Sequence, residues 1–319
     1  MIALVLGLLV IGAAVAVFLS NKQSYRTNLA LGQVQENARI AFELMARDVR
    51  QAGLTGCGNT GRVGNVLNNG TNAGGTVAWY ADFGNAIRGY DASVADPAVT
   101  SGTSSAQRIA ATSSLTVIGA APTGTSVATH TLASRSFTLT GGNPGLQAGD
   151  LIVVCDPDHA VIAQISDISG GALFARNTGA TPGNCSVGLG FPTLCTAAGN
   201  AYQFAANSQI AQLMAVDWYI GNNPVGGRSL YRRTPLTTAG VPTPTSQEMV
   251  RNVTDLQITY HIAGGAGFVT AAVVTAASAW ATVDAVRLLI TLTGSERATG
   301  TDGQAITRQL SAVVNLRNR

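Results

Sequence analysis

Charge is scarce in this chain of 319 residues. Only 11% of the residues are charged, and Lys22 is the single lysine among 19 basic residues. Nucleic-acid binding by counterion release needs a concentrated basic stripe, whereas the net charge here is +3 and evenly spread. We therefore expect no nucleic-acid partner.

Motifs of known chemistry are also missing. The chain has no GxSxG elbow, HExxH helix, P-loop or dinucleotide fingerprint. Asp156 and Asp158 flank Pro157, and this pattern is more typical of a turn than of a carboxylate dyad or a calcium site. We expect a protein that is not an enzyme, with no cofactor and no small-molecule substrate.

Paired metal ligands are absent as well. No CxxC occurs, and the three histidines, His130, His159 and His261, are far apart, so we expect no metal site and interpret His159 and His261 as residues of strand surfaces or ends. The four cysteines, Cys57, Cys155, Cys185 and Cys195, favour disulfides and an oxidising compartment. A local Cys185–Cys195 bridge across a Gly- and Pro-containing loop would leave Cys57 to meet Cys155. The other two connectivities stay open.

A long apolar run is present at the start. Every residue from Met1 to Leu19 is apolar or glycine, which gives a helix of roughly 28 Å, enough for a hydrocarbon core of about 30 Å. A secretory signal would have a basic region first and a shorter apolar core. We expect membrane or helix-packing contacts from Met1, Ile2, Leu4, Val5, Leu8, Leu9, Ile11, Val15 and Phe18.

The charges around this run conflict with the cysteines. Lys22 and Arg26 follow the run, which by the positive-inside rule would hold the rest of the chain in the cytoplasm. The cysteines indicate the opposite side. A basic leader upstream of Met1 would remove the conflict, and we expect one.

The helix is predicted to continue to about Gly53. No proline intervenes, and apolar residues recur at steps of three and four, which predicts a face that packs on a sheet. Glu36 with Arg39, and Glu43 with Arg47, would pair on the solvated face. The expected packing residues are Val34, Ala38, Ala41, Phe42, Met45 and Val49.

The remaining chain is β-rich. From Cys57 to about Gln107 we expect irregular structure with short strands, in which Trp79 and Tyr90 pack under a loop or, alternatively, form a binding patch. Short β-branched segments from Ser114 onward predict strands, with a hairpin in LIVVCDPDHAVIAQI. Arg232 and Arg233 are interpreted as a solvated strand end. The fold class is therefore α+β: one long helix, hydrophobic and then amphipathic, on an antiparallel sheet with long loops.

Several blocks resemble one family in the same order. MIALVLGLLVIGAAVAVF, QENARIAFELMARDVRQAGLTGC, GNAIRGYD, MVRNVTDLQITY and WATVDAVRLLITLTGS resemble the PilW family of type IV pilus minor pilins over the whole chain. The resemblance implies a pilin-like fold and a prepilin with a short basic leader. That leader, its cleavage site and the glutamate beyond it would all lie upstream of Met1.

The resemblance also implies a function and partners. The protein would help to prime pilus assembly in a minor-pilin tip complex, with other minor pilins, the major pilin and a PilY-type tip adhesin as partners. It would cross the inner membrane once, with its C-terminal domain in the periplasm, before it enters the pilus. The expected division is a transmembrane or pilus-core segment at 1–19, an amphipathic continuation at 20–53 and an extracytoplasmic domain at 54–319. Alternatives are a type II secretion pseudopilin and a membrane-anchored periplasmic binding module.

Overall fold

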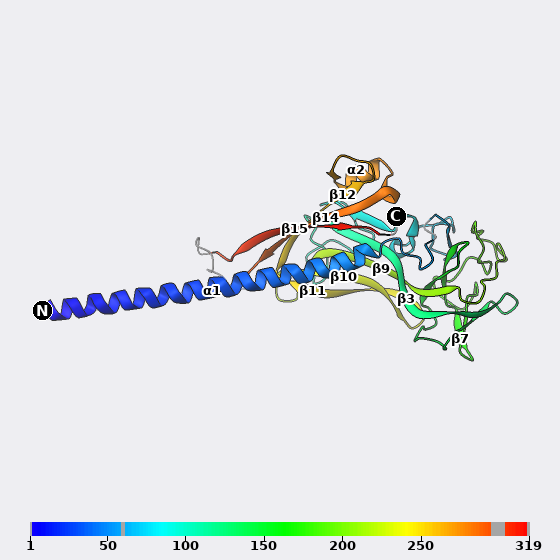
Figure 1. Cartoon of the computed structure of the whole chain (residues 1–319), viewed down its shortest axis with the longest axis horizontal. Coiled ribbons are helices and arrows are strands. Elements are labelled where there is room, and N and C mark those ends of the chain that lie inside the picture. The colour runs from blue at the N-terminus through cyan, green and yellow to red at the C-terminus, as the bar shows by residue number, and fades with distance from the viewer. Residues whose placement is uncertain (1, 59–60, 295–303, 318–319) are drawn as a thin grey trace.

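One helix dominates the shape of the molecule. The computed structural model describes residues 2–58, 61–294 and 304–317. Helix α1 (Ile2–Arg50) is continuous over 49 residues, and its N-terminal part projects from the body while its C-terminal part lies against strands (Figure 1). The uninterrupted helix is confirmed, and it ends three residues before the expected glycine.

The larger sheet has 11 strands and is mostly antiparallel. Its main path runs β1-β6-β5-β9-β3-β4-β8-β7, while β10 and β11 extend from β9 and β2 pairs with β3. Its strands are β1 (Val63–Asn65), β2 (Ile87–Tyr90), β3 (Ser114–Thr131), β4 (Ser136–Leu139), β5 (Leu151–Cys155), β6 (Ala160–Gln164), β7 (Asp167–Ser169), β8 (Ala172–Phe174), β9 (Gln209–Asn222), β10 (Arg228–Thr238) and β11 (Val241–Arg251). Among the strands that the structure describes, only β1 and β6 pair in parallel.

A second sheet has four strands and lies on the opposite side of α1 from β10 and β11 of the larger sheet (Figure 1). Its order is β13-β12-β14-β15, and each pair is antiparallel. The strands are β12 (Val253–Ile262), β13 (Phe268–Val269), β14 (Val283–Thr293) and β15 (Thr307–Asn315), with the short helix α2 (Ala271–Ala276) between β13 and β14. Three single 3-10 turns are η1 (Trp79–Ala81), η2 (Phe83–Asn85) and η3 (Trp280–Thr282).

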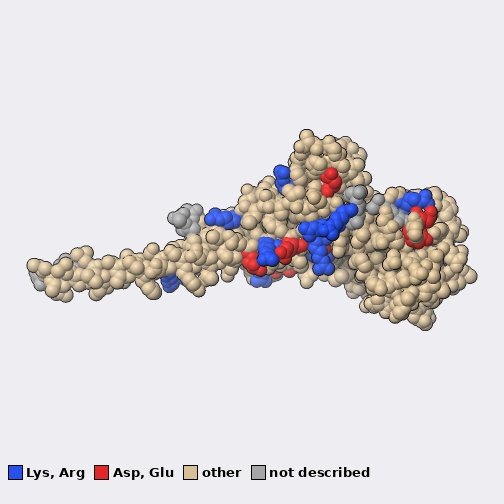
Figure 2. Space-filling model, viewed as in Figure 1, with Lys and Arg blue, Asp and Glu red and all other residues tan. Residues whose placement is uncertain are grey.

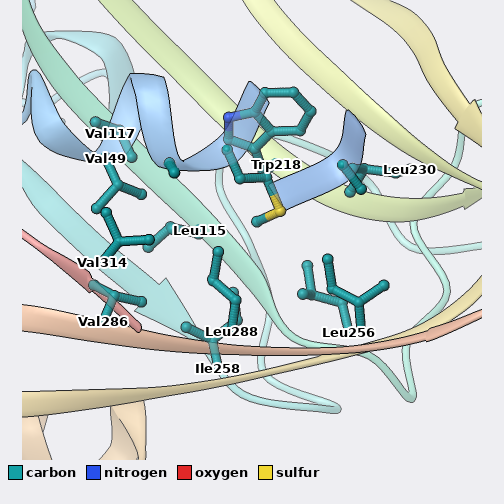
Figure 3. Packing of buried hydrophobic residues seen from close by; sticks show 14 of the residues in the cluster. Val49, Leu115, Val117, Trp218, Leu230, Leu256, Ile258, Val286, Leu288 and Val314 are labelled. Atoms are coloured by element: carbon teal, nitrogen blue, oxygen red, sulfur yellow. The ribbon is translucent and has the colours of Figure 1, made fainter. Parts of the chain in front are cut away.

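The main core lies where α1 meets both sheets. Side chains from α1, β3, β9, β10, β12, β14 and β15 form one buried cluster, and Figure 3 shows Val49 of the helix beside Val117 of β3 and Val314 of β15. Buried and more exposed residues alternate along most of β14, because one face of the strand packs on this cluster. The residues on that face are Val286, Leu288, Ile290 and Leu292. Burial of this apolar surface holds the helix on the sheets.

A second core fills the part of the body distant from the free end of α1. Strands β5 and β6 are buried on both faces, because alternate residues of each strand enter two different clusters. The predicted hairpin is confirmed, with Cys155 paired to Ala160 across the turn. The α+β class is confirmed too.

Two elements, β11 and α2, were not predicted from the local sequence pattern. Strand β11 contains Pro242 and Pro244, residues that count against a strand. It pairs only with β10, and a strand at the edge of a sheet tolerates missing N–H donors. Helix α2 is six residues long, too short for a helical period to appear.

Candidate functional site

The first half of α1 exposes apolar side chains to solvent. Ile2, Leu8 and Phe18 are 79%, 75% and 67% exposed. Leu4, Leu9, Ile11 and Val15 are exposed as well, while Met1 and the side chain of Val5 lie outside the described residues. Figure 2 shows this part of the helix almost without charged atoms on the visible face.

Such a surface needs an apolar partner. Within the described residues, α1 is the one helix long and apolar enough to cross a membrane. Soluble monomers rarely expose contiguous apolar surface on this scale, and this part of α1 is suited to contact with lipid or with other apolar helices.

The second half of α1 is packed on the body. Val34, Ala38, Ala41, Met45 and Val49 are almost fully buried. Phe42 packs against the same cluster but stays partly exposed. On the outer face the ion pair joins Arg39 to Glu43 at 2.9 Å, rather than the pairs expected from Glu36 and Arg47.

A buried carboxylate anchors the end of the helix. Asp48 is 5% exposed, and its Oδ2 accepts hydrogen bonds from Nε1 of Trp218 at 3.0 Å and from Nε of Arg232 at 2.9 Å. Both donors belong to the larger sheet, on β9 and β10. A buried carboxylate is costly unless it is paired in this way, so the three groups fix the position of α1 along the sheet.

The prediction that Arg232 and Arg233 form a solvated strand end is wrong. Arg232 is half-buried because its guanidinium turns toward Asp48, and Arg233 donates to the hydroxyl of Ser246 at 2.7 Å. Sequence reasoning missed Asp48 altogether. The signal was its place in the buried stripe, three residues after Met45 and next to Val49.

A cavity of about 470 Å³ lies beside this anchor. Its walls combine apolar groups from Leu44, Met214 and Met249 with the guanidinium of Arg47. Arginine side chains also gather where the helix meets the sheets (Figure 2). This junction is the most basic part of the visible face.

Two disulfides tie the distal core together. Cys57 bonds to Cys155, with Cα atoms 5.9 Å apart, and so connects the segment after α1 to β5. Cys185 bonds to Cys195 within a loop, with Cα atoms 5.0 Å apart. A cross-link stabilises chiefly by restricting the unfolded chain, so the first bridge keeps the helix end near the sheet.

The histidines have structural surroundings. His159 immediately precedes β6 and is fully buried, not on a surface. Its Nδ1 and Nε2 contact Asp158 Oδ2 at 2.9 Å and the Leu189 carbonyl at 2.8 Å. His261 lies near the end of β12, where its hydrogen bond to Asp284 raises its pKa. Burial lowers the pKa of His130 to about 4.

The Asp156 carboxylate stabilises the turn between β5 and β6. Asp156 Oδ1 accepts the backbone N–H groups of Asp158 and His159, at 2.9 and 3.2 Å. Over the ranges that the structure describes, no three His, Cys, Asp or Glu side chains lie together as metal ligands.

The fold and the exposed helix define a class of protein. It is an α+β protein whose long helix is half fixed on its own sheets and half free to enter a membrane or a helix bundle. Residues 217–318 match the family model PilW, described as type IV pilus-assembly protein W. Residues 217–318 are therefore similar to PilW proteins, in agreement with the sequence resemblance, and this match supports a role in type IV pilus assembly.

The matched region has a clear place in the structure. It begins within β9 and includes β10, β12, β14 and β15, the strands that hold the second half of α1. The segments between α1 and β9 lie outside it. No curated protein and no solved structure matches the chain significantly.

Proposed function

We propose that this protein is a minor pilin that helps to prime the type IV pilus as part of a tip complex. The observation that carries the proposal is the division of α1 into an exposed apolar half and a half anchored on the PilW-family strands. A subunit with this division can stand in a bilayer before assembly and in a bundle of apolar helices afterward. The proposal involves no catalysis.

The length of the free half fits both environments. Ile2 to Leu19 spans about 27 Å at 1.5 Å per residue, close to the thickness of a hydrocarbon core. We infer that 1–19 is the membrane and fibre segment, that 20–53 supports the body, and that 54–319 is the extracytoplasmic domain. The two disulfides support a periplasmic location for that domain.

The partners follow from the same reasoning. The free half of α1 would pack against the helices of other minor pilins and of the major pilin. The body would meet neighbouring subunits and, at the tip, a PilY-type adhesin. Before assembly the protein would cross the inner membrane once.

The test places the same change at two equally exposed valines. Val15 on the free half of α1 is 50% exposed, and Val273 on α2 is 49% exposed. An aspartate at the centre of a membrane helix costs about 2.5–3.5 kcal/mol and less toward its end, where Val15 lies, and it is unfavourable in an apolar bundle too. We expect Val15→Asp to remove the protein from sheared pili and reduce piliation, while Val273→Asp leaves both unchanged.

The outcomes separate the alternatives. Piliation that survives both Val15→Asp and deletion of the gene would contradict the proposal. Loss of a secreted enzyme with pili intact would favour a type II secretion pseudopilin. Recovery of the wild-type protein only from inner membranes, never from sheared fibres, would favour a membrane-anchored binding module.

A further inference from the structure

A cavity of about 350 Å³ opens between the segment after β1 and strand β3. It lies outside the region that matches the family model, and the proposed function makes no use of it. The segment GNAIRGYD supplies three of its polar side chains, and η1 supplies an aromatic one. The lining residues used below are Trp79, Asp82, Asn85, Arg88, Tyr90 and Thr116.

The cavity has hydrogen-bond donors that the described part of the chain does not use. The Arg88 guanidinium has one loose ion pair, 3.6 Å from Asp82 Oδ2, and lies 5.8 Å from the Tyr90 ring centroid. Among the described residues, neither the Tyr90 hydroxyl nor Trp79 Nε1 has a hydrogen-bond partner. Burial raises the pKa of Tyr90, so the hydroxyl stays protonated and can both donate and accept.

Acceptors stand opposite these donors. Asn85 Nδ2 donates to Asp82 Oδ2 at 2.9 Å, which leaves the carbonyl oxygen of the amide and the second carboxylate oxygen without a partner among the described residues. One guanidinium and one carboxylate give the lining no net charge. An anion would meet Asp82 and a cation would meet Arg88, so the arrangement favours a neutral ligand whose groups both donate and accept.

The walls are held in place before any ligand enters. The Asn65 amide donates to the Ala81 carbonyl at 2.8 Å, and the Asn69 amide donates to the Tyr80 hydroxyl at 2.8 Å. Behind the cavity, the Thr116 hydroxyl donates to the buried Asp217 at 3.4 Å. A site formed in advance loses little ordering entropy on binding.

From these features we propose that the cavity binds one neutral sugar unit of a glycan. Hydroxyl groups act as both donors and acceptors, and the C–H face of a pyranose can lie on the half-buried Tyr90 ring, while the buried Trp79 offers its indole N–H. The volume equals that of about twelve water molecules at about 30 Å³ each, and a hexose has about as many non-hydrogen atoms. Small-ligand sites begin at about 300 Å³.

The experiment measures binding to the full chain in a detergent without a sugar headgroup. Glucose, galactose, mannose, N-acetylglucosamine and N-acetylgalactosamine are tested singly by saturation-transfer NMR, and glucuronate and galacturonate serve as anionic probes. We expect at least one neutral sugar to bind with a dissociation constant of about 10 mM or lower. Calorimetry then gives the affinity of each variant for that sugar.

The variants remove single groups. Arg88→Gln is expected to weaken binding about tenfold or more, and Tyr90→Phe about threefold to tenfold. The matched control is Arg62→Gln, because Arg62 also pairs with an aspartate, Asp158, and lies over an aromatic ring, but elsewhere on the surface. It should change the affinity less than twofold, in line with the small effect of a distant exposed charge.

Three results would overturn the proposal. The first is that no neutral sugar binds the wild-type chain at about 10 mM, a result that does not depend on how any variant folds. The second is binding of the uronates alone. The third is a sugar affinity that Arg88→Gln and Tyr90→Phe leave unchanged, or that Arg62→Gln lowers equally. None of these results bears on incorporation into pili, so the proposed function is tested separately.

Discussion

Replacement of Asp48 by alanine should loosen α1 from the sheets. The change leaves two donors without their acceptor: Trp218, which is fully buried, and Arg232, whose side chain is 28% exposed. A buried donor left unpaired costs about 1–3 kcal/mol, and an unpaired buried charge costs more. Because Arg232 can partly turn to solvent, we expect a loss of about 2–4 kcal/mol in the free energy of unfolding. That is a large fraction of a typical stability of about 5–15 kcal/mol.

Two further variants apportion this loss. Asp48→Asn keeps the shape and one acceptor oxygen, so it should cost about 1–2 kcal/mol. Trp218→Phe removes the indole N–H, and a double-mutant cycle with Asp48→Ala, which removes the acceptor, should give a coupling of about 1–2 kcal/mol between the two groups. The control is Glu43→Gln, because Glu43 is 64% exposed in its pair with Arg39, and such pairs contribute less than about 1 kcal/mol.

The measurement is urea unfolding of the full chain in detergent, followed by near-ultraviolet circular dichroism. This signal reports on the environment of the three tryptophans, and two of them, Trp218 and Trp280, lie in the cluster on which α1 packs. The reasoning would be refuted if Asp48→Ala destabilised the protein no more than Glu43→Gln. A zero coupling in the cycle would refute the specific role of the indole hydrogen bond.

Three other predictions concern the body. Burial lowers the pKa of His130 from 6.5 to about 4, so between these pH values the unfolded chain binds a proton that the folded chain lacks. The free energy of unfolding should therefore fall by about 2–3 kcal/mol from pH 7 to pH 4. Urea unfolding at both pH values should show a smaller loss in His130→Gln. The Cys57–Cys155 bridge joins cysteines 98 residues apart, and the Cys185–Cys195 bridge joins cysteines 10 residues apart. Replacing both cysteines of the first bridge by serine should therefore cost about 2 kcal/mol more, measured by thermal unfolding, than the same change at the second. Equal losses would contradict the loop-entropy account. A Cβ at Gly119 would overlap the backbone oxygen of Gln51, so Gly119→Ala should destabilise the helix junction by about 1–3 kcal/mol and expose it to limited proteolysis, with an unchanged cleavage pattern as the contrary result.

Local patterns predicted the secondary structure well. The helix shows an unbroken period without proline, and the β5–β6 hairpin shows two apolar runs around an Asp-Pro-Asp turn. Both signals lie within a few residues of the element that they specify. Strand β11 escaped prediction because its prolines are tolerated only at a sheet edge, and edge position is a property of the assembled sheet.

The long apolar start, the α+β class and the resemblance to pilus-assembly proteins were determined by the sequence alone. Apolar composition and period act on neighbours in the chain, so they need no tertiary information. Tertiary structure decided which polar groups meet. Asp48 and Trp218 are separated by 170 residues, and the cavity brings η1 and GNAIRGYD together with Thr116 of β3. Such encounters depend on strand pairing across the whole sheet, and a partner at that distance leaves no trace in the local pattern.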